Sequence, residues 1–388
     1  MSKVFVVAQG GGPTAVINAT VAGVVTAVRQ RYPGAQIFGA RHGVRGIRND
    51  HFIDLSAISD ADLQRLAHTP GAALGSTRDK PDAAYCERIL NQLRAVAADA
   101  FIYVGGNDTA GTLEVLAGAD DGKIAFVHAP KTIDNDLVEN DHTPGFISAA
   151  LFVAHAFRSV DLDFQALPGV YVGIVMGRHA GFLTASSAAW RRSESDGPHL
   201  VYVPERPFSI EGFLADVRDA RQRFGRCVVA MSEGVAGADG RPLAEMLKAE
   251  IERDAHGNVQ LSTGELGQAV QMELAREFPG VRARVDTFGY LPRSFSGLIG
   301  DVDRREAFDA GVHAVAVAAE GNGSVTIGAS TEERISKIGS VPLDAVAGKT
   351  RHMPDSFLLP DSQHLSPEGT RYFTRLLPAP PDIYAPFL

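Results

Sequence analysis

The stretch "IAFVHAPKTIDND", residues 124–136, joins a short apolar run to a polar segment that holds a lysine, a threonine and two aspartates. Similar apolar runs recur along the chain, each followed by a turn and a helical pattern; they span residues 4–8, 101–106, 170–177, 200–205, 227–234 and 284–289. Strands that are continuously apolar are typical of parallel sheets joined by helical crossovers, because such strands are buried on both faces. The sequence therefore predicts an α/β fold, and its length of 388 residues predicts two domains.

The overall composition excludes several classes of protein. Lysine and arginine number 37 against 46 acidic residues, and the net charge of -9 disfavours a broad attraction to nucleic acid or to an anionic membrane surface. The two cysteines, Cys86 and Cys227, are far apart, which supports neither a disulfide framework nor a zinc site. No stretch has the length of an apolar membrane span. We therefore expect a cytoplasmic protein with no nucleic-acid partner and no membrane partner.

The polar segment after residue 130 carries the main chemical signal. Alternate residues of an extended chain project to the same side, so Asp134 and Asp136 can address one site, with Thr132 in line behind them. Phosphoryl transfer needs a carboxylate that draws off the proton of the acceptor hydroxyl, and cations that neutralise the transferring group. The alternative is a solvated Asp-Asn-Asp turn, which the preceding apolar strand disfavours.

Two glycine turns, "GGGP" at 10–13 and "VGGNDTAGT" at 104–112, each follow a predicted strand. Pro13 stands where a helix can open, and bare N–H groups at a helix N-terminus attract phosphate. Neither turn is a dinucleotide fingerprint or a Walker loop, and no acid is placed for a ribose, so a dinucleotide oxidoreductase is excluded. Asp108 in the second turn would repel a phosphate, although it could instead cap the following helix together with Thr109.

The motifs taken together carry a family resemblance. "GGNDT" (105–109), "PKTIDND" (130–136) and "MGRHAG" (176–181), in this order, resemble the phosphofructokinase family and in particular its pyrophosphate-dependent branch. The resemblance covers nearly the whole chain and includes "GGGPTAVINA" (10–19), "LGSTR" (74–78), "VVAMSEG" (228–234) and "RARVDTFGYLPR" (282–293). It implies reversible transfer of a phosphoryl group from pyrophosphate to the 1-hydroxyl of fructose 6-phosphate, with Mg²⁺ as cofactor. It also implies a homodimer or homotetramer.

The resemblance assigns a role to each matching position. On the donor side, Gly11 is expected to meet the donor phosphates, and Arg78 to steady the donor and the transition state. Asp134 is the expected general base, and Thr132, Ile133 and Asp136 of the same signature are expected at the substrate. On the sugar side the expected residues are Met176, Gly177 and Arg178 for the sugar phosphate, Glu233 for its hydroxyls, and Arg284, Tyr290 and Arg293 for the 6-phosphate. In the family some of these residues come from a neighbouring subunit.

Two positions point to pyrophosphate as the donor. Members that use ATP resemble this chain but have glycine in place of Asp108 and of Lys131. A carboxylate at position 108 occupies the place and mimics the charge of the α-phosphate of a nucleotide, so ATP is excluded. Lys131 then supplies a positive charge to a donor that has no nucleoside.

Two other positions depart from the family. Asn107 stands where the family commonly has an aspartate that binds magnesium; an amide oxygen can still coordinate the metal but brings no charge. Gly169 stands where many members have an arginine that reaches the 6-phosphate. A looser pocket could admit a longer sugar such as sedoheptulose 7-phosphate.

The resemblance also implies the domain organisation. The donor domain is expected to comprise residues 1–146 and 291–343, and the sugar-phosphate domain residues 147–290 and 344–388, with Rossmann-like folds and the active site in the cleft between them. Residues 234–264 are expected to form a surface excursion. The alternatives are an ATP-dependent 6-phosphofructokinase and a non-catalytic sugar-phosphate-binding regulatory subunit; the joint presence of Asp134, Asp136, Arg178 and Arg293 argues against the second.

Overall fold

The chain forms two compact units, each built from discontinuous segments. The first unit comprises Met1–Ala149 and Arg293–Arg351, and the second comprises Ala150–Pro292 and His352–Leu388. The computed structural model describes residues 2–246, 263–330 and 336–382. Most of the expected excursion at 234–264 and the last residues of the expected sugar-phosphate domain, 383–388, lie outside the described residues.

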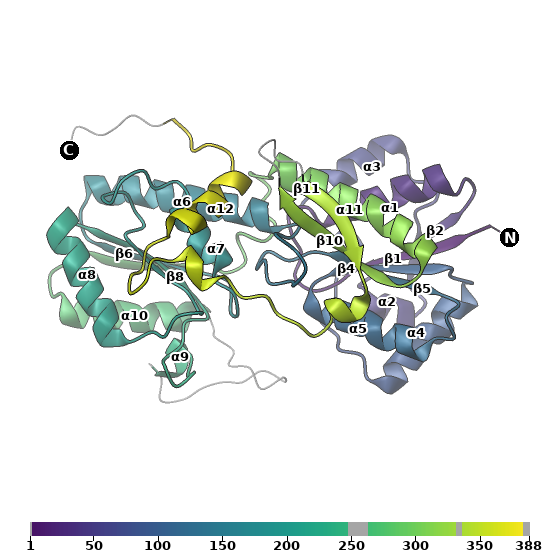
Figure 1. Ribbon diagram of the computed structural model, residues 1–388, viewed down its shortest axis with the longest axis horizontal. Helices are drawn as coiled ribbons and strands as arrows, with labels where there is room; N and C mark the ends of the chain where they lie inside the picture. The colour runs from purple at the N-terminus through teal and green to yellow at the C-terminus, as the bar shows by residue number, and fades with distance from the viewer. Residues whose placement is uncertain (1, 247–262, 331–335, 383–388) are drawn as a thin grey trace. The chain divides into compact units, whose positions relative to one another are not determined.

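The first unit contains, within the described residues, a seven-stranded sheet with the order β11-β10-β5-β4-β1-β2-β3 (Figure 1). The neighbours are parallel except for the pairs β2–β3 and β10–β11, which are antiparallel. The strands span Val4–Gln9 (β1), Gln36–Ala40 (β2), Phe52–Asp54 (β3), Ala100–Gly105 (β4), Ala125–Pro130 (β5), Gly323–Ser330 (β10) and Ser336–Val341 (β11).

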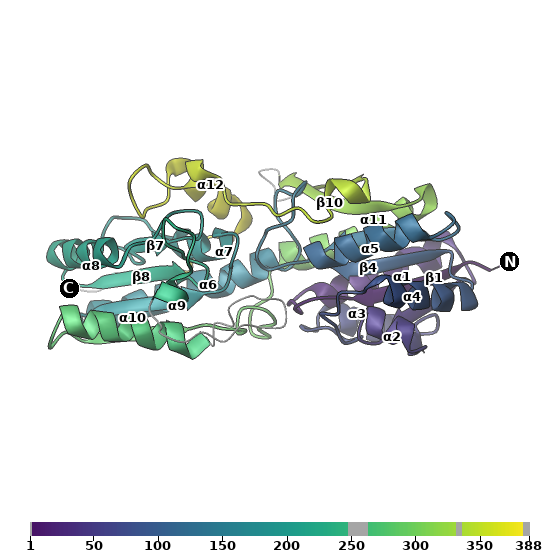
Figure 2. The same cartoon turned by 90° about the horizontal axis from the view of Figure 1, so that it is seen from below.

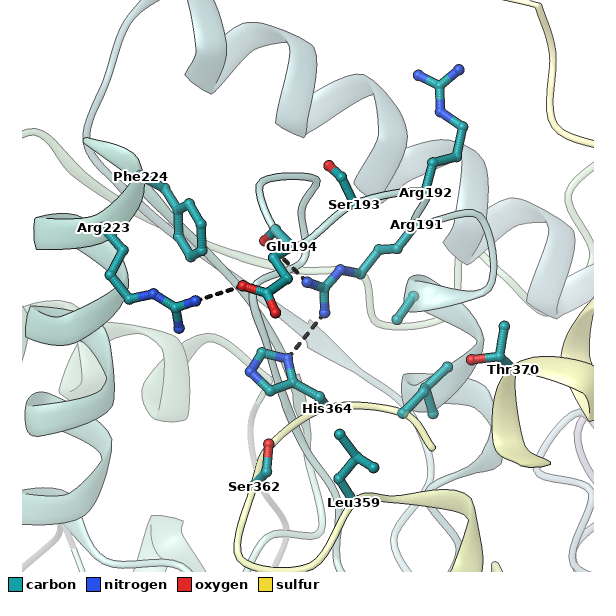
Figure 3. A pocket seen from close by; sticks show the side chains of 12 residues that line it. Arg191, Arg192, Ser193, Glu194, Arg223, Phe224, Leu359, Ser362, His364 and Thr370 are labelled. Carbon is teal, nitrogen blue, oxygen red and sulfur yellow. Dashed lines mark hydrogen bonds and ion pairs between the residues drawn. The ribbon is translucent and has the colours of Figure 1, made fainter. Parts of the chain in front are cut away.

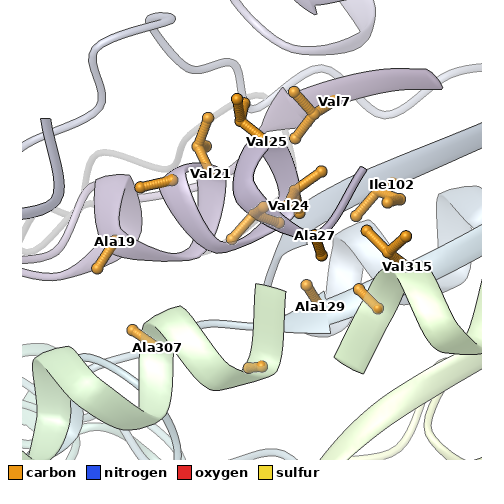
Figure 4. Packing of buried hydrophobic residues seen from close by; sticks show 14 of the residues in the cluster. Val7, Ala19, Val21, Val24, Val25, Ala27, Ile102, Ala129, Ala307 and Val315 are labelled. Carbon is orange, nitrogen blue, oxygen red and sulfur yellow. The ribbon is translucent and has the colours of Figure 1, made fainter. Parts of the chain in front are cut away.

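Helices cover both faces of this sheet. Valines and alanines of α1 and α11 pack on one face, against side chains such as Val7, Ile102 and Ala129 (Figure 4). Residues of α4 and α5 pack with Phe101 and Phe126 on the other face. The helices span Ile17–Arg31 (α1), Val44–Arg48 (α2), Asp60–Ala67 (α3), Ala83–Ala95 (α4), Asn107–Ala119 (α5) and Asp301–Glu320 (α11).

Glycines allow α1 and α11 to approach each other closely. A Cβ atom on Gly311 would lie 2.1 Å from the carbonyl oxygen of Thr20, and one on Gly23 would lie 2.0 Å from that of Phe308. Any side chain at either position would collide with backbone, so these two glycines fix how α11 lies on the sheet.

The second unit contains a parallel four-stranded sheet with the order β7-β8-β6-β9. Figure 2 labels β7 and β8 of this sheet. Apolar residues of α8 and α10 pack with side chains of all four strands, and Phe157 of α6 packs against Tyr171 of β6. The elements span Val170–Val175 (β6), Leu200–Tyr202 (β7), Cys227–Ser232 (β8), Ala283–Thr287 (β9), Phe146–Ala166 (α6), Phe182–Ala185 (α7), Ile210–Phe224 (α8), Leu243–Met246 (α9), Thr263–Glu277 (α10) and Pro367–Leu376 (α12).

The observed elements confirm the predicted α/β class and correct one helix boundary. Each of the predicted apolar runs overlaps a strand of the structure. The helix expected to open at Pro13 begins only at Ile17. The reason is that the carbonyl of Thr14 accepts a hydrogen bond from the N–H of Gly71, which holds the intervening residues as a loop. No helix within the described ranges has the length and apolar character needed to cross a bilayer.

Candidate active site

Three neighbouring parallel strands of the first unit end at one edge of its sheet. Gln9 of β1 pairs with Val104 of β4, and Gly105 pairs with Pro130 of β5. The glycine turn 10–12, the start of α5 and the segment 131–136 therefore follow from adjacent strand ends. The carboxyl edge of an open parallel sheet is where α/β proteins usually bind ligands.

The first glycine turn differs from the expectation of bare N–H groups. The N–H of Gly10 donates to the carbonyl of Val104 at 2.8 Å, and that of Gly11 donates to the carbonyl of Thr77 at 3.0 Å. Gly11 has a φ of +73°, which favours glycine. The turn thus holds the segment that ends in Arg78, whose side chain is exposed. The N–H of Gly11 is therefore already used within the protein, and it is not available to donate to a donor phosphate.

Lys131 places a positive charge in a nearly closed environment at this edge. The residue is 3% exposed, and its Nζ donates to the carbonyl of Gly12 at 2.7 Å. Burial lowers the pKa of Lys131 to about 8; the charges of Arg293 and Arg78 lower it further, while Asp134 and Asp136 oppose them. Because such effects act only over short distances, the four charged side chains lie in the neighbourhood of the lysine.

The carboxylates of Asp134 and Asp136 are close enough for the charge of one to affect the pKa of the other. Burial, and then the charge of Asp134, raise the pKa of Asp136 to about 7. The N–H of Asp134 donates to Oγ1 of Thr132 at 3.1 Å, and Nδ2 of Asn107 donates to Oδ2 of Asp136 at 3.3 Å. Near neutral pH a proton on Asp136 leaves the pair with one negative charge, which can act as a base at Asp134.

Asn107 offers an oxygen that suits a hard cation. Its Oδ1 is buried and has no hydrogen-bond partner in the described part of the chain, while the same side chain contacts the carboxylate of Asp136. Amide and carboxylate oxygens are the donors that Mg²⁺ prefers. Within the described ranges no cluster of three or more His, Cys, Asp or Glu residues could hold a metal. The amide oxygen of Asn107 and the carboxylate of Asp136 therefore fit a magnesium ion.

Asp108 lies in the first turn of α5, next to Asn107. Its side chain is 78% exposed and pairs with Lys80 at 3.3 Å. The cap of α5 is Gly106, so Asp108 is not the capping residue. A carboxylate in this place faces solvent, where an approaching ligand can meet it.

A second group of predicted residues lies in the second unit, where β6 and β8 end side by side. Val175 pairs with Ser232, and Oγ of Ser232 donates to the carbonyl of Gly177 at 2.6 Å. Nε of Arg178 lies 3.7 Å from Oε1 of Glu233. The structure therefore brings the segment 176–178, which includes Met176, together with Glu233.

The residues expected around the 6-phosphate are not grouped within either unit. Arg284 pairs with Tyr171, toward the amino ends of the strands, whereas the segment 176–178 follows their carboxyl ends. Tyr290 is 67% exposed in the second unit, and Arg293 belongs to the first, where its guanidinium carbon lies 3.0 Å from the place of a Cβ on Gly12.

Gly169 cannot simply be exchanged for a larger residue. A Cβ atom there would lie 2.4 Å from the carbonyl oxygen of Arg282. The backbone of this chain thus excludes an arginine at position 169 unless it moves.

Sequence reasoning missed a buried group next to the segment 131–136. His142 lies between Asp141 and Glu306, and Asp303 accepts hydrogen bonds from Gly145 and Ser148. The long sequence separation of α11 from these partners hides the contacts from any local pattern.

The second unit also contains a pocket of about 620 Å³ apart from the predicted residues. Arg191 donates to His364 and to the carbonyl of Glu194, and Arg223 pairs with Glu194 (Figure 3). None of the residues predicted from the sequence lines this pocket.

Comparisons with known proteins identify the family of the chain. The profile of the family described as phosphofructokinase matches residues 4–318. A pyrophosphate–fructose 6-phosphate 1-phosphotransferase of Rhodospirillum rubrum is 50% identical over 96% of this chain and 93% of its own, and one of Xanthomonas campestris is 37% identical over 95% and 90%. The crystal structure of a pyrophosphate-dependent phosphofructokinase from Nitrosospira multiformis is similar with a TM-score of 0.85 at 30% identity, covering 100% of this chain and 95% of that one.

Proposed function

Because the chain belongs to the phosphofructokinase family, we propose that it transfers a phosphoryl group from pyrophosphate to the 1-hydroxyl of fructose 6-phosphate, with Asp134 as the general base. The products are fructose 1,6-bisphosphate and phosphate. The reaction is reversible because the anhydride bond of pyrophosphate is close in free energy to the phosphate ester that is formed.

The residues of the first unit provide the charge that the donor needs. Lys131 lies within electrostatic range of Arg78, Arg293 and the two aspartates, and these three cations can offset the charge of pyrophosphate. As the bond to the bridging oxygen breaks, Lys131 can donate a proton or a hydrogen bond to the departing phosphate. Its lowered pKa makes this ammonium a better proton donor than an exposed lysine.

The aspartates divide the proton chemistry between them. Asp134 accepts the proton of the 1-hydroxyl while that oxygen attacks the terminal phosphorus of pyrophosphate. Thr132 holds the backbone of Asp134 in place through its hydroxyl. Without the metal, a proton on Asp136 lowers the negative charge of the pair; Asp136 would release that proton when its carboxylate binds Mg²⁺.

Asn107 and Asp136 are the residues that would hold Mg²⁺, through the buried amide oxygen and the carboxylate. The ion would supply positive charge to the phosphate oxygens.

The residues of the second unit suit the sugar phosphate. Arg178 offers a guanidinium group, and Glu233 beside it can accept hydrogen bonds from sugar hydroxyls. The φ of +126° at Gly177 and the hydrogen bond from Ser232 fix this turn at the strand ends.

The observation that supports the proposal best is the buried Lys131 among two arginines and two aspartates. Burying a lysine to 3% exposure costs free energy unless its charge is compensated by neighbouring groups or by a bound anion. Together with an exposed acid at position 108, it favours a compact donor without a nucleoside.

The direct test is an assay of the purified protein with fructose 6-phosphate and either pyrophosphate or ATP, with and without Mg²⁺. We expect kcat/KM for pyrophosphate to exceed that for ATP by at least about a hundredfold, and to require Mg²⁺. Turnover of fructose 6-phosphate with ATP but not with pyrophosphate would identify a nucleotide-dependent enzyme. Binding of fructose 6-phosphate without turnover by either donor would identify a regulatory subunit.

A second acceptor in the same assay tests the sugar. Sedoheptulose 7-phosphate is the longer alternative that Gly169 suggested. A preference for fructose 6-phosphate above about a hundredfold would exclude it as a substrate of importance.

A further inference from the structure

The segment that carries the proposed base folds back on itself. Residues 131–136, the catalytic limb, are joined to residues 140–145, the return limb, by several contacts. The N–H of Thr132 donates to the carbonyl of Pro144 at 3.2 Å, and Oγ1 of Thr143 donates to the carbonyl of Thr132 at 2.9 Å. Since Thr132 also accepts the N–H of Asp134, the position of the base depends on where the return limb is held.

Two buried carboxylates of α11 hold the return limb. Asp303 accepts the N–H of Gly145 at 2.7 Å and that of Ser148 at 2.9 Å. Glu306, one helical turn further along, lies 2.8 Å from Nε2 of His142 and accepts the hydroxyl of Ser336 on its other oxygen. Both carboxylates are almost fully buried, so water cannot readily replace them as hydrogen-bond acceptors.

His142 is clamped from two sides. It is completely buried, with Nδ1 2.8 Å from Oδ2 of Asp141 and Nε2 2.8 Å from Oε2 of Glu306. Burial lowers the pKa of His142, but the hydrogen bonds with the two acids outweigh it and raise the pKa to about 9. The ring is therefore an imidazolium near neutral pH, and both of its N–H groups donate to a carboxylate.

We propose that His142 is a positioning residue for the transfer reaction: clamped between Asp141 and Glu306, it fixes the return limb on α11 and thereby sets Thr132 and Asp134 for proton abstraction. The inference rests on the proposed function, in which Asp134 is the base. His142 itself acts through the backbone of the two limbs.

Two charged residues near the clamp, Arg351 and Asp301, help to choose a control variant. Arg351 donates to the carbonyls of Asp136 and Asp141, through its N–H and its guanidinium, and so ties the end of the catalytic limb to the start of the return limb. Asp301 lies on the same helix as Glu306, but its side chain is 93% exposed. Asp301→Asn is therefore a matched control for Glu306→Gln, because it removes an acid from the same helix outside the clamp.

The experiment compares His142→Gln, Glu306→Gln, the double variant and Asp301→Asn in steady-state assays with pyrophosphate and fructose 6-phosphate. We expect kcat to fall by about 10- to 100-fold in each single variant of the clamp while both KM values stay within about threefold. The kcat of the double variant should be no lower than that of the less active single variant, because each substitution disrupts the same clamp. Asp301→Asn should keep the kcat of the parent protein.

Amide hydrogen exchange of the same proteins gives a readout that does not need turnover. Peptides covering residues 131–145 should exchange at least about tenfold faster in the clamp variants, while those covering β4 should not change. If the parent protein transfers no phosphate from pyrophosphate, the proposed function fails, and unchanged exchange at 131–145 would separately overturn the clamp.

A kcat of His142→Gln within about threefold of the parent value would contradict the proposal, as would effects that multiply in the double variant. If His142→Gln does not fold, Glu306→Gln provides the test, because glutamine keeps the size of the side chain but removes the negative charge that pairs with the imidazolium of His142.

Discussion

At the scale of single residues, Lys131 connects the electrostatics of the site to a measurable pH dependence. Its pKa is lowered to about 8, so the fraction of protonated lysine falls above that pH. If the charge serves the donor, kcat/KM for pyrophosphate should fall about tenfold for each pH unit above 8.

Lys131→Arg separates the lysine from the ionisation of the substrate. Arginine keeps its charge at any accessible pH, so this variant should lose the alkaline fall of kcat/KM even if its activity is lower. A fall with the same midpoint in both proteins would show that the substrate, and not Lys131, titrates there.

Asp108 and Lys131 together should determine the choice of donor. The double variant Asp108→Gly, Lys131→Gly should lose most turnover with pyrophosphate and reduce its preference over ATP by at least about a hundredfold. The measurement is kcat/KM for each donor.

Lys80→Ala provides the control for this pair. It breaks the ion pair with Asp108 but leaves the acid, so the preference for pyrophosphate should remain. Loss of preference in Lys80→Ala would move the discrimination from the acid to the ion pair.

Some of these residues could be predicted from the sequence and others could not. Lys131, Asp134 and Asp136 follow an apolar strand in one short segment, so the sequence alone predicts that they lie near each other. Glu306 and His142 are 164 positions apart and meet only because α11 packs on the sheet.

At the scale of elements, burial explains which strands could be predicted. The central strands β1, β4 and β5 are buried along nearly their whole length and are mostly apolar, so they are visible in the sequence. Strands β2, β3, β10 and β11 were not predicted. Three of these four have exposed or half-buried residues along their length, and β10 is interrupted by glycine. Polar residues on outer strands weaken the apolar signal.

The crossing of α1 and α11 gives a prediction about stability. Gly311→Ala should destabilise the fold by about 2 kcal/mol or more, because the added methyl group would meet the carbonyl of Thr20. Chemical unfolding of the purified variant measures this loss.

Gly111→Ala is the matched control on α5, where a Cβ atom would have no neighbour within 4 Å. This variant should gain about 0.5–1 kcal/mol, since alanine favours a helix more than glycine does. Equal stabilities of the two variants would contradict the close packing of α1 on α11.

At the scale of the whole molecule, the position of Arg284 leads to a prediction about the oligomeric state. Within the second unit Arg284 lies toward the opposite strand ends from the segment 176–178. This separation favours a role for Arg284 at the 6-phosphate of a neighbouring copy of the chain. We therefore expect a homodimer or homotetramer in which Arg284 acts in a neighbouring site.

Mixed oligomers test this expectation. Arg284→Ala should raise KM for fructose 6-phosphate by about tenfold or more, and Asp134→Asn should be inactive. Co-expressed, the two variants should recover activity at subsaturating fructose 6-phosphate, because one site of each mixed pair is intact. Arg78→Ala paired with Asp134→Asn should not recover if both residues serve the site of their own chain; no recovery in the first pair would place Arg284 in its own chain's site or outside any site.

The central claim is that the carboxylate of Asp134 takes the proton of the sugar hydroxyl. The most direct measurement is the kcat of Asp134→Asn together with calorimetric binding of fructose 6-phosphate. We predict a loss of about 10³-fold or more in kcat with a dissociation constant within about threefold of the parent value. A variant that keeps more than about a tenth of the parent kcat would contradict the account.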